Sequence, residues 1–154
     1  MSVTHAVHGP LDLAQLIGRV SAPDRGATAS FVGTVRAGPD DGPVIRIEYS
    51  AYEAMLDEEF GRISTEAAAR WPGTAIAAQH RLGTVPLGEA SIAVVVAAPH
   101  RAAALDACRF VIEEAKRRLP VWKREVLADG TTAWRDNEGG RVPGGGPTRT
   151  GPAT

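Results

Sequence analysis

The sequence predicts an α+β domain with a largely antiparallel sheet. Apolar residues alternate with polar ones in several short segments, and they follow helical spacing in only three. Most of the predicted strands follow one another directly, without the crossover helix that parallel neighbours need. The chain of 154 residues, with 44% hydrophobic and 23% charged residues, has the size and composition of one globular domain.

The first third of the chain is predicted to form a short helix and two strands. Asp12 and Gln15 fit a capping box at the start of the helix. Four apolar residues then share one helical face: Leu13, Leu16, Ile17 and Val20. Segments Ala27–Val35 and Val44–Tyr52 alternate small or apolar residues with polar ones, which is typical of half-buried strands. Between them, residues 37–43 contain two Gly, two Pro and two Asp, which indicates an exposed loop.

The middle of the chain is predicted to form a long helix and two strands. The helix begins at Glu53 and ends at Trp71-Pro72-Gly73. One apolar stripe runs along it: Leu56, Phe60, Ile63 and Ala67. Strands are expected at Thr74–Leu82 and Ala90–Ala98, separated by turn residues at 83–88, and the second is apolar enough to be central in the sheet.

The last third is predicted to form a second long helix, a hairpin and a tail. The helix runs from Arg101 to Leu119, where Pro120 ends it. Strands at Val121–Leu127 and Thr131–Trp134 then form a hairpin around Asp129-Gly130. The last twenty residues contain six Gly, three Pro and almost no large apolar side chain, so burial cannot offset the entropy cost of ordering them. We therefore expect one domain at residues 1–135 and a disordered tail at residues 136–154.

Charge and composition exclude several classes of protein. Seventeen Lys and Arg against eighteen Asp and Glu give a net charge of -1, so the chain lacks the excess positive charge of a non-specific nucleic-acid binder. The longest apolar run, Ala90–Pro99, is too short to span a membrane, and no apolar leader follows Met1, so we expect a cytoplasmic protein. Because Cys108 is the only cysteine, neither an intrachain disulfide nor a thiolate metal cage can form.

The strongest local charge anomaly is the segment 116–125, which holds five cations in ten residues. Cations in the last turn of a helix stabilise its dipole, and on the pattern alone this simpler interpretation of Lys116 is favoured. Pro120, however, lets the next strand fold back and bring Lys123 near Lys116. Two neighbouring lysines lower the pKa of at least one of them, and a lysine with a lowered pKa serves as a base or a nucleophile.

Other candidate residues carry weaker signals. Pro99-His100-Arg101 lies where a strand meets a helix, whose free backbone N–H groups attract phosphate, although a histidine there can equally satisfy local backbone groups. Arg36 closes a strand just before the exposed loop, where most arginines only aid solubility. Gly33 indicates a bulge or a close backbone approach. Cys108 lies on the apolar stripe of its helix, which favours a buried, unreactive thiol.

Three segments together resemble the MoaE family, whose members are catalytic subunits of molybdopterin synthase: Phe31–Arg36, Pro99-His100-Arg101, and Lys116 with Pro120–Glu125. Their order and separations are those of the family, and the match covers about residues 10 to 135. The resemblance implies an α/β-hammerhead fold with two long helices. It also implies a homodimer of this chain that binds two small ubiquitin-like sulfur-carrier subunits ending in Gly-Gly, giving a heterotetramer.

The implied reaction transfers sulfur from the terminal thiocarboxylate of the carrier to cyclic pyranopterin monophosphate. Two rounds form the dithiolene that later binds molybdenum. The carrier tail and the substrate phosphate are both anions, and a local cationic cluster would bring them together in one pocket. No metal or bound cofactor is needed for this chemistry, and neither nucleic acid nor membrane is an expected partner.

The resemblance assigns catalysis to Lys116 and Lys123. Lys116 is expected to stabilise the oxyanion of the carrier's acyl group, and Lys123 to assist proton transfer at the pterin. The remaining substrate-binding residues that it implies are Thr34, Val35, Arg36, His100, Arg101, Arg124 and Glu125. Ala37 stands where many relatives carry Asn, and the tail matches no family pattern, so neither Arg135 nor Arg141 receives a role.

Two other classes of function use the same residues. A non-catalytic module would bind a phosphate or a nucleotide with these cations, and a structural dimer would leave the basic segment as a solvated face. Neither requires His100-Arg101 to occur together with Lys116 and Lys123. The sequence contains no P-loop, dinucleotide-binding turn or nucleophile elbow, which removes the commonest nucleotide-binding and serine-hydrolase interpretations.

Overall fold

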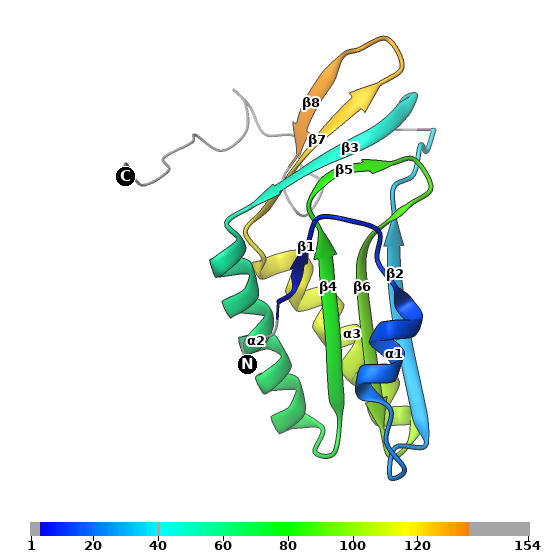
Figure 1. Cartoon of the computed structure of the whole chain (residues 1–154), viewed down its shortest axis with the longest axis vertical. Coiled ribbons are helices and arrows are strands. Elements are labelled where there is room, and N and C mark those ends of the chain that lie inside the picture. Colours follow the sequence, from blue (N-terminus) through cyan, green and yellow to red (C-terminus); the bar gives the residue numbers. More distant parts are fainter. Residues whose placement is uncertain (1–3, 40, 136–154) are drawn as a thin grey trace.

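The computed structural model describes residues 4–39 and 41–135, which fold into two four-stranded sheets and three helices (Figure 1). The first sheet has the order β1-β4-β6-β2, with bounds β1 (Ala6–Val7), β4 (Ala75–Arg81), β6 (Ala90–Ala98) and β2 (Ala27–Thr34). The second sheet has the order β5-β3-β7-β8, with bounds β5 (Gly83–Pro86), β3 (Val44–Ala51), β7 (Val121–Leu127) and β8 (Thr132–Arg135). All described strand pairs are antiparallel except β1 with β4, which confirms the predicted fold class.

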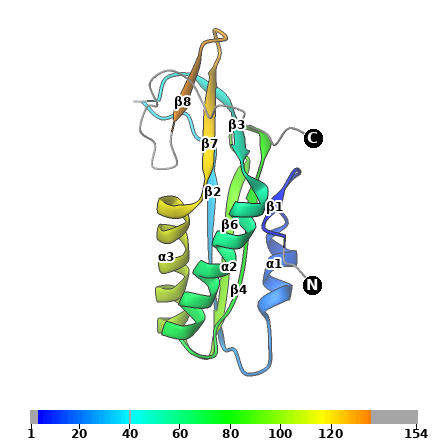
Figure 2. The same cartoon turned by 90° about the vertical axis from the view of Figure 1, so that its left-hand side faces the viewer.

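The three helices cover both faces of the first sheet (Figure 2). Helices α2 (Glu53–Arg70) and α3 (Arg101–Arg118) pack on one face, and α1 (Leu13–Val20) packs on the other. Side chains of β6 alternate between the two cores, with Val94 and Val96 facing α2 and α3, and Val95 facing α1. The strand is therefore buried on both faces, as its continuous apolar sequence predicts.

The predicted helices and the terminal hairpin are confirmed with small shifts in their ends. The Asp12 carboxylate accepts the backbone N–H of Gln15 at 3.0 Å, so the predicted cap of α1 forms. Cys108 is buried in α3, and burial raises the pKa of its thiol, as expected of an unreactive cysteine. The predicted tail, residues 136–154, lies outside the described residues.

One local prediction is wrong, because residues 83–86 form a strand rather than a turn. Gly83 has a φ of +83°, and this left-handed conformation redirects the chain from β4 in the first sheet to β5 in the second. Strand β5 pairs with β3, in the register Ile47 to Val85. This pairing joins segments far apart in the sequence, so local turn residues alone do not reveal it.

The junction between the two sheets positions the site. Helix α3 ends beside the first sheet, and Pro120 leads directly into β7, which enters the second sheet next to β3. The last turn of α3 therefore lies where the two sheets meet (Figure 1). In the described part of the chain, none of the helices is both long and apolar enough to cross a membrane.

Candidate functional site

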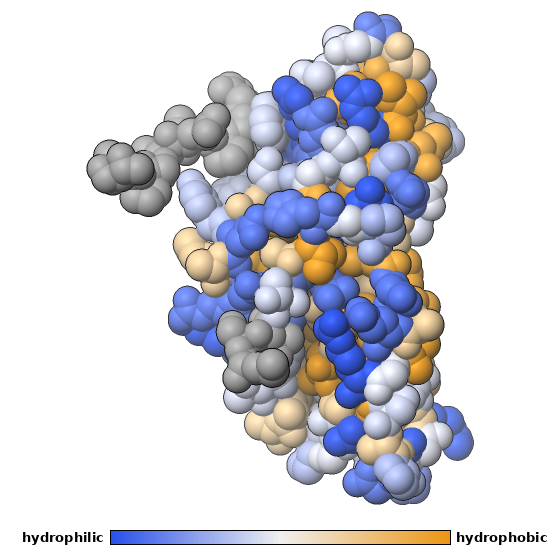
Figure 3. All heavy atoms as spheres, in the orientation of Figure 1, coloured by the Kyte–Doolittle hydropathy of each residue, from blue (hydrophilic) through white to orange (hydrophobic). Residues whose placement is uncertain are grey.

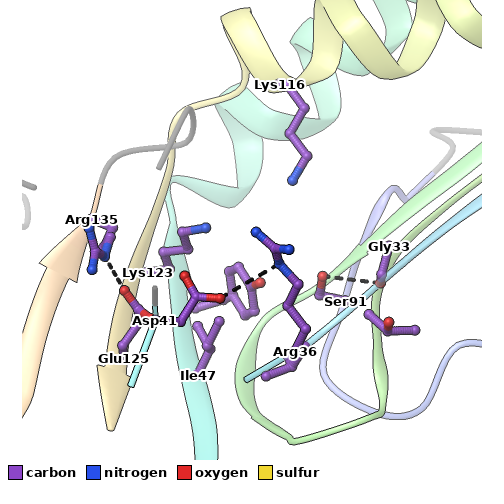
Figure 4. A pocket seen from close by; sticks show the side chains of 12 residues that line it. Gly33, Arg36, Asp41, Ile47, Ser91, Lys116, Lys123, Glu125 and Arg135 are labelled. Atoms are coloured by element: carbon purple, nitrogen blue, oxygen red, sulfur yellow. Dashed lines mark hydrogen bonds and ion pairs between the residues drawn. The ribbon is translucent and has the colours of Figure 1, made fainter. Parts of the chain in front are cut away.

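A pocket of about 680 Å³ opens at this junction, beside the last turn of α3 (Figure 4). Six of the residues predicted for the site line it: Thr34, Val35, Arg36, Lys116, Lys123 and Glu125. Six further lining residues were not predicted as site residues, although the sequence had singled out the first of them for its backbone: Gly33, Asp41, Ile47, Tyr49, Ser91 and Arg135. Both sheets and the end of α3 therefore contribute to one pocket.

Two lysines reach into the pocket from consecutive elements. Lys116 extends from the last turn of α3, and Lys123 extends from β7 toward the same space (Figure 4). The fold-back at Pro120 thus brings both ammonium groups into one pocket, as the sequence predicts. Burial lowers the pKa of Lys116, and the positive charge of Lys123 lowers it further.

A bulge at the end of β2 directs three residues toward the pocket. The register between β2 and β6 shifts between Gly33 and Thr34. A Cβ atom at Gly33 would lie 2.8 Å from Cγ2 of Ile92, so the Ile92 side chain occupies the space that a side chain at position 33 would need. The bulge re-aims the following residues, Thr34, Val35 and Arg36, which all line the pocket. The bulge that Gly33 indicates in the sequence is confirmed, whereas the close contact at this glycine is with a side chain rather than with a backbone.

Replacing Gly33 with alanine is expected to lower the free energy of unfolding by about 1–3 kcal/mol, as overpacking does. Ile92 is fully buried, so it cannot move away from the added methyl group at small cost. Denaturant unfolding measures the change. The control is Gly18→Ala, since Gly18 lies in α1 with open space around it and alanine favours the helix. Equal stability of the Gly33 variant and the wild type would show that β2 and β6 can separate freely.

Arg36 and Asp41 form an ion pair at the pocket entrance. The guanidinium Nε lies 3.7 Å from the Asp41 carboxylate, which also accepts the backbone N–H of Gly38 at 3.0 Å. The Arg36 side chain is 82% exposed, so an incoming anion can reach it from solvent. Arg36 therefore has the position and the charge to bind a phosphate at the mouth of the pocket.

Glu125 and Arg135 form a second ion pair on the pocket wall. The Glu125 side chain is only 9% exposed, and the guanidinium offsets the cost of burying its charge. Strand β8 brings Arg135 there, because it pairs with β7 in the register Lys123 to Arg135. The predicted hairpin ends at Trp134. One more residue in its second strand would have placed Arg135 directly opposite Lys123, so the hairpin register could have identified Arg135 as a pocket residue from the sequence.

The floor of the pocket is formed by Ile47, Tyr49 and Ser91. Burial raises the pKa of the Tyr49 hydroxyl, and the nearby Glu125 charge also raises it, so this hydroxyl stays neutral. The edge of the Tyr49 ring packs on His80, with the ring centroids 5.0 Å apart. Behind the floor, burial lowers the pKa of His80 from 6.5 to about 4, with smaller contributions from the charges of Lys116 and Lys123.

Stability is expected to fall between pH 6.5 and about 4, because of His80. In this window the unfolded chain binds a proton that the folded, neutral His80 does not, so the free energy of unfolding decreases as the pH falls. A shift of this size corresponds to about 3 kcal/mol. Denaturant unfolding of wild type and His80→Gln across the window measures the difference in pH dependence. His8→Gln is the control, since His8 is exposed; an unchanged pH dependence in the His80 variant would contradict the expectation.

Arg124 lies outside the pocket lining, unlike its neighbours Lys123 and Glu125. Alternate residues of a strand point to opposite faces, so Arg124 projects away from the pocket. Its guanidinium pairs with Glu48 and lies 5.9 Å from the centre of the Trp134 ring. Within one chain, Arg124 therefore joins β3, β7 and β8 on the outer face of the second sheet, which differs from the expected role in substrate binding.

His100 and Arg101 lie at the opposite end of α3 from Lys116. His100 is the N-cap residue of the helix and Arg101 is its first residue. At a rise of about 1.5 Å per residue, roughly 22 Å of helix separates Arg101 from Lys116. A single chain therefore does not bring these two residues into the pocket with the lysines.

The pocket lining carries a local excess of positive charge. Its described cations are Arg36, Lys116, Lys123 and Arg135, and its carboxylates are Asp41 and Glu125. The chain as a whole has a net charge of -1, so the cationic groups are concentrated here. Such a pocket binds anions and stabilises negative charge that develops during a reaction.

A family model described as MoaE protein matches residues 6–118 of the chain. The molybdopterin synthase catalytic subunit of Drosophila grimshawi is 46% identical over 114 residues, which cover 73% of this chain and 32% of that protein. Molybdopterin synthase catalytic subunit 1 of Aedes aegypti is 42% identical over 131 residues, which cover 83% of this chain and 84% of that protein. The chain thus spans about a third of the first relative and most of the second.

Solved structures with the same fold include molybdopterin synthase from Staphylococcus aureus. Its TM-score is 0.82 at 29% identity, and the match covers 86% of this chain and 96% of that chain. A second is a protein–protein complex of subunits 1 and 2 of the molybdopterin-converting factor from Helicobacter pylori, with a TM-score of 0.69 at 27% identity, covering 80% of this chain and 84% of that chain.

Proposed function

Because this chain belongs to the MoaE protein family, we propose that it is a sulfurtransferase, the catalytic subunit of a molybdopterin synthase. It takes sulfur from the C-terminal thiocarboxylate of a small ubiquitin-like carrier subunit and transfers it to cyclic pyranopterin monophosphate. Each transfer replaces one oxygen of the substrate side chain with sulfur and leaves the carrier with a carboxylate. Two transfers form the dithiolene of molybdopterin.

The observation that carries this proposal is the convergence of Lys116, Lys123 and Arg36 on one pocket. The reaction brings together two anions, the carrier tail and the substrate phosphate, and cations on several sides offset their repulsion. A module that only binds phosphate would not need a partly buried lysine whose pKa is lowered. That lysine favours the catalytic function over the phosphate-binding alternative.

The residues of the pocket have different roles in the reaction. Lys116 stabilises the oxyanion that forms on the carrier's acyl group, and Lys123 assists proton transfer at the pterin. Arg36 binds the phosphate, next to Thr34 and Val35 on the bulged end of β2. Glu125 lines the same pocket and holds the guanidinium of Arg135.

A homodimer would complete the pocket. Strand β2 is an edge of the first sheet, and apolar side chains gather along this side of the molecule in Figure 3. Two large apolar residues of β2, Phe31 and Val32, are 39% and 40% exposed. An exposed apolar edge of this kind is a ready site for a second copy of the chain. We propose that two copies pair here around a two-fold axis.

This pairing supplies the residues that one chain does not bring to its own pocket. The register between β2 and β6 puts Ala27 opposite Ala98, so His100 and Arg101 follow closely beyond the start of β2. In an antiparallel β2 pair, the start of the partner's strand lies beside the end of this chain's strand, near Arg36. The partner subunit's His100 and the partner subunit's Arg101 would then reach the phosphate from the other side.

The proposed assembly has two further parts. The carrier binds each catalytic subunit with its C-terminal tail in the pocket, and the solved complex of the two Helicobacter pylori subunits supports such a pair. Residues 1–135 form the catalytic domain, and the protein works in the cytoplasm, where the carrier and the pterin precursor are soluble.

The test is a reconstituted reaction with purified components. The full chain is mixed with the thiocarboxylated carrier and cyclic pyranopterin monophosphate, and the dithiolene product is quantified as its fluorescent oxidised derivative. The matched control is the same carrier with an ordinary C-terminal carboxylate, which has no sulfur to give. Product from the thiocarboxylate alone is expected. If the folded protein binds the carrier and yields no product, the sulfurtransferase proposal is wrong.

A further inference from the structure

Arg118, the last residue of α3, joins this helix to α2 through a group of carboxylates. Its Nε donates to Glu59 at 2.6 Å, and its two terminal nitrogens donate to the two oxygens of Glu66 at 2.8 and 3.0 Å. Glu114, one turn earlier in α3, accepts a further hydrogen bond from Arg118 at 3.3 Å. The Arg118 side chain is 20% exposed, so its guanidinium is largely sheltered from solvent. We call these four residues the Arg118 clamp.

The Arg118 clamp fixes the orientation of the last helical turn as well as its position. A guanidinium that donates two parallel hydrogen bonds to one carboxylate has little freedom to rotate, and Arg118 binds Glu66 in this way. Glu59 and Glu66 are seven residues apart on α2, so the clamp spans about 10 Å of that helix. Both helices also contribute buried apolar residues to one core, which already holds them together. The clamp therefore acts mainly on the direction of the end of α3.

Lys116 lies on the other side of the same helical turn. Two residues separate Lys116 from Arg118, which corresponds to a rotation of about 200° around the helix axis. The side chains agree with this geometry, because Lys116 lines the pocket and Arg118 binds the carboxylates of α2. Without the Arg118 charge, three carboxylates would be left close together and would repel one another. A shift or rotation of the helix end would then move the Lys116 ammonium relative to the pocket.

We propose that Arg118 is a positioning residue, which holds the last turn of α3 against α2 so that Lys116 points at the reacting acyl group of the carrier. The inference rests on the proposed function, since Lys116 acts there on that acyl group. Arg118 itself lies outside the pocket lining, so its effect on the reaction passes through Lys116. This requirement distinguishes Arg118 from a residue that only stabilises the fold.

Replacing Arg118 with glutamine tests this role in a single turnover of the full chain, with thiocarboxylated carrier and cyclic pyranopterin monophosphate both saturating. A small misplacement of a catalytic group slows a reaction strongly, so the rate should fall by about tenfold to a hundredfold. In the Lys116→Ala protein the same replacement should have no further effect, because the group that it misplaces is absent. Arg118→Lys should restore part of the rate, since lysine keeps the charge but not the two parallel hydrogen bonds.

Two further variants separate the Arg118 clamp from the general charge of the segment. Arg117→Gln is the matched control, because it removes a positive charge from the same turn and its ion pair with Glu114 lies within α3. Its rate should stay within about twofold of the wild type. Glu66→Gln weakens the clamp from α2, and it decides the question if Arg118→Gln does not fold. It should lower the rate in the same way, again only when Lys116 is present.

Chemical labelling tests the position of Lys116 without the reaction. Lys116 and Lys123 are the only lysines of the chain, so mass spectrometry after acetylation with acetic anhydride reports each of them separately. The labelling rate as a function of pH gives the pKa of Lys116, which burial and the charge of Lys123 lower in the wild type. In Arg118→Gln this pKa should rise, as the ammonium moves toward solvent. The other titratable groups around the pocket are the same in both proteins: Arg36, Asp41, Tyr49, His80, Glu125 and Arg135.

The outcomes distinguish this inference from the proposed function. Equal losses of rate from Arg118→Gln in the presence and in the absence of Lys116 overturn the positioning role, and so does an unchanged rate. A pKa of Lys116 that does not rise in the variant also overturns it. A wild-type protein that forms no product would instead overturn the proposed function, and the labelling would still show whether Arg118 holds Lys116 in place.

Discussion

Replacing Lys116 with alanine is expected to reduce sulfur transfer by about a hundredfold to a thousandfold, the usual cost of losing one oxyanion donor. The ammonium group extends from α3 into the pocket, where burial strengthens its interaction with a developing negative charge. Product formed in a single turnover, with carrier and pterin both saturating, measures the chemical step rather than binding. The loss should therefore appear in the single-turnover rate.

The neighbouring residue in α3 provides the control for Lys116. Arg117→Ala removes one positive charge from the same helical turn, but the Arg117 side chain is 66% exposed and pairs with Glu114 outside the pocket. Its activity should stay within about twofold of the wild type, since exposed ion pairs contribute little. A similar loss in both variants would mean that the basic segment matters only through its general charge.

The lowered pKa of Lys116 adds a dependence on pH to the same prediction. An oxyanion donor must be protonated, so the rate should decline on the alkaline side as the pH rises through the pKa of Lys116. Burial and Lys123 both lower that pKa, so the decline should begin below the range of an ordinary lysine. In Lys123→Ala one of the two causes is gone, and the alkaline decline of the residual activity should move to higher pH.

The elements that could be predicted from the sequence are those whose stability is decided locally. Helix α2 buries the stripe Leu56, Phe60, Ile63 and Ala67, and its apolar spacing alone indicates this face. Strand β6 is apolar from Ile92 to its end because both of its faces are covered by helices. Strand β5 was missed because its formation depends on pairing with β3, and its own residues favour turns.

The same distinction applies to the candidate site. Lys116, Lys123 and Arg36 lie next to features that are visible in the sequence, namely a helix end, a proline and a strand end. Tyr49 and Ser91 instead meet across two different sheets, and no local pattern relates residues on β3 and β6. Arg124 was assigned to the pocket with its neighbours, but the two-residue repeat of a strand turns it to the opposite face.

His100 and Arg101 raise the question of which chain they serve. Their distance from Lys116 along α3 means that they either act in the pocket of a second copy or have no part in the reaction. Strand β2, with its exposed apolar edge and its start beside the end of β6, favours the first possibility. The activity of a homodimer with His100→Ala and Arg101→Ala, compared with that of a dimer containing two different variants, separates the two.

A heterodimer of one Lys116→Ala chain and one chain carrying His100→Ala with Arg101→Ala is expected to keep about half of the wild-type activity. In this heterodimer one pocket contains both defects and the other contains none, whereas each homodimeric variant is defective in both pockets. Co-expression with two different affinity tags and sequential purification yields the heterodimer for the single-turnover assay.

The control heterodimer combines Lys116→Ala in one chain with Lys123→Ala in the other. Both lysines belong to the pocket of their own chain, so each pocket keeps one defect and the heterodimer should stay as inactive as the two homodimers. Three results together would assign His100 and Arg101 to the partner's pocket: inactivity of the homodimer with His100→Ala and Arg101→Ala, activity in the first heterodimer, and inactivity of the second. Inactivity of both would contradict the shared site, because no arrangement with an intact pocket would then exist. The Lys116→Ala chain is common to both heterodimers, so a general loss of stability in that variant affects both alike.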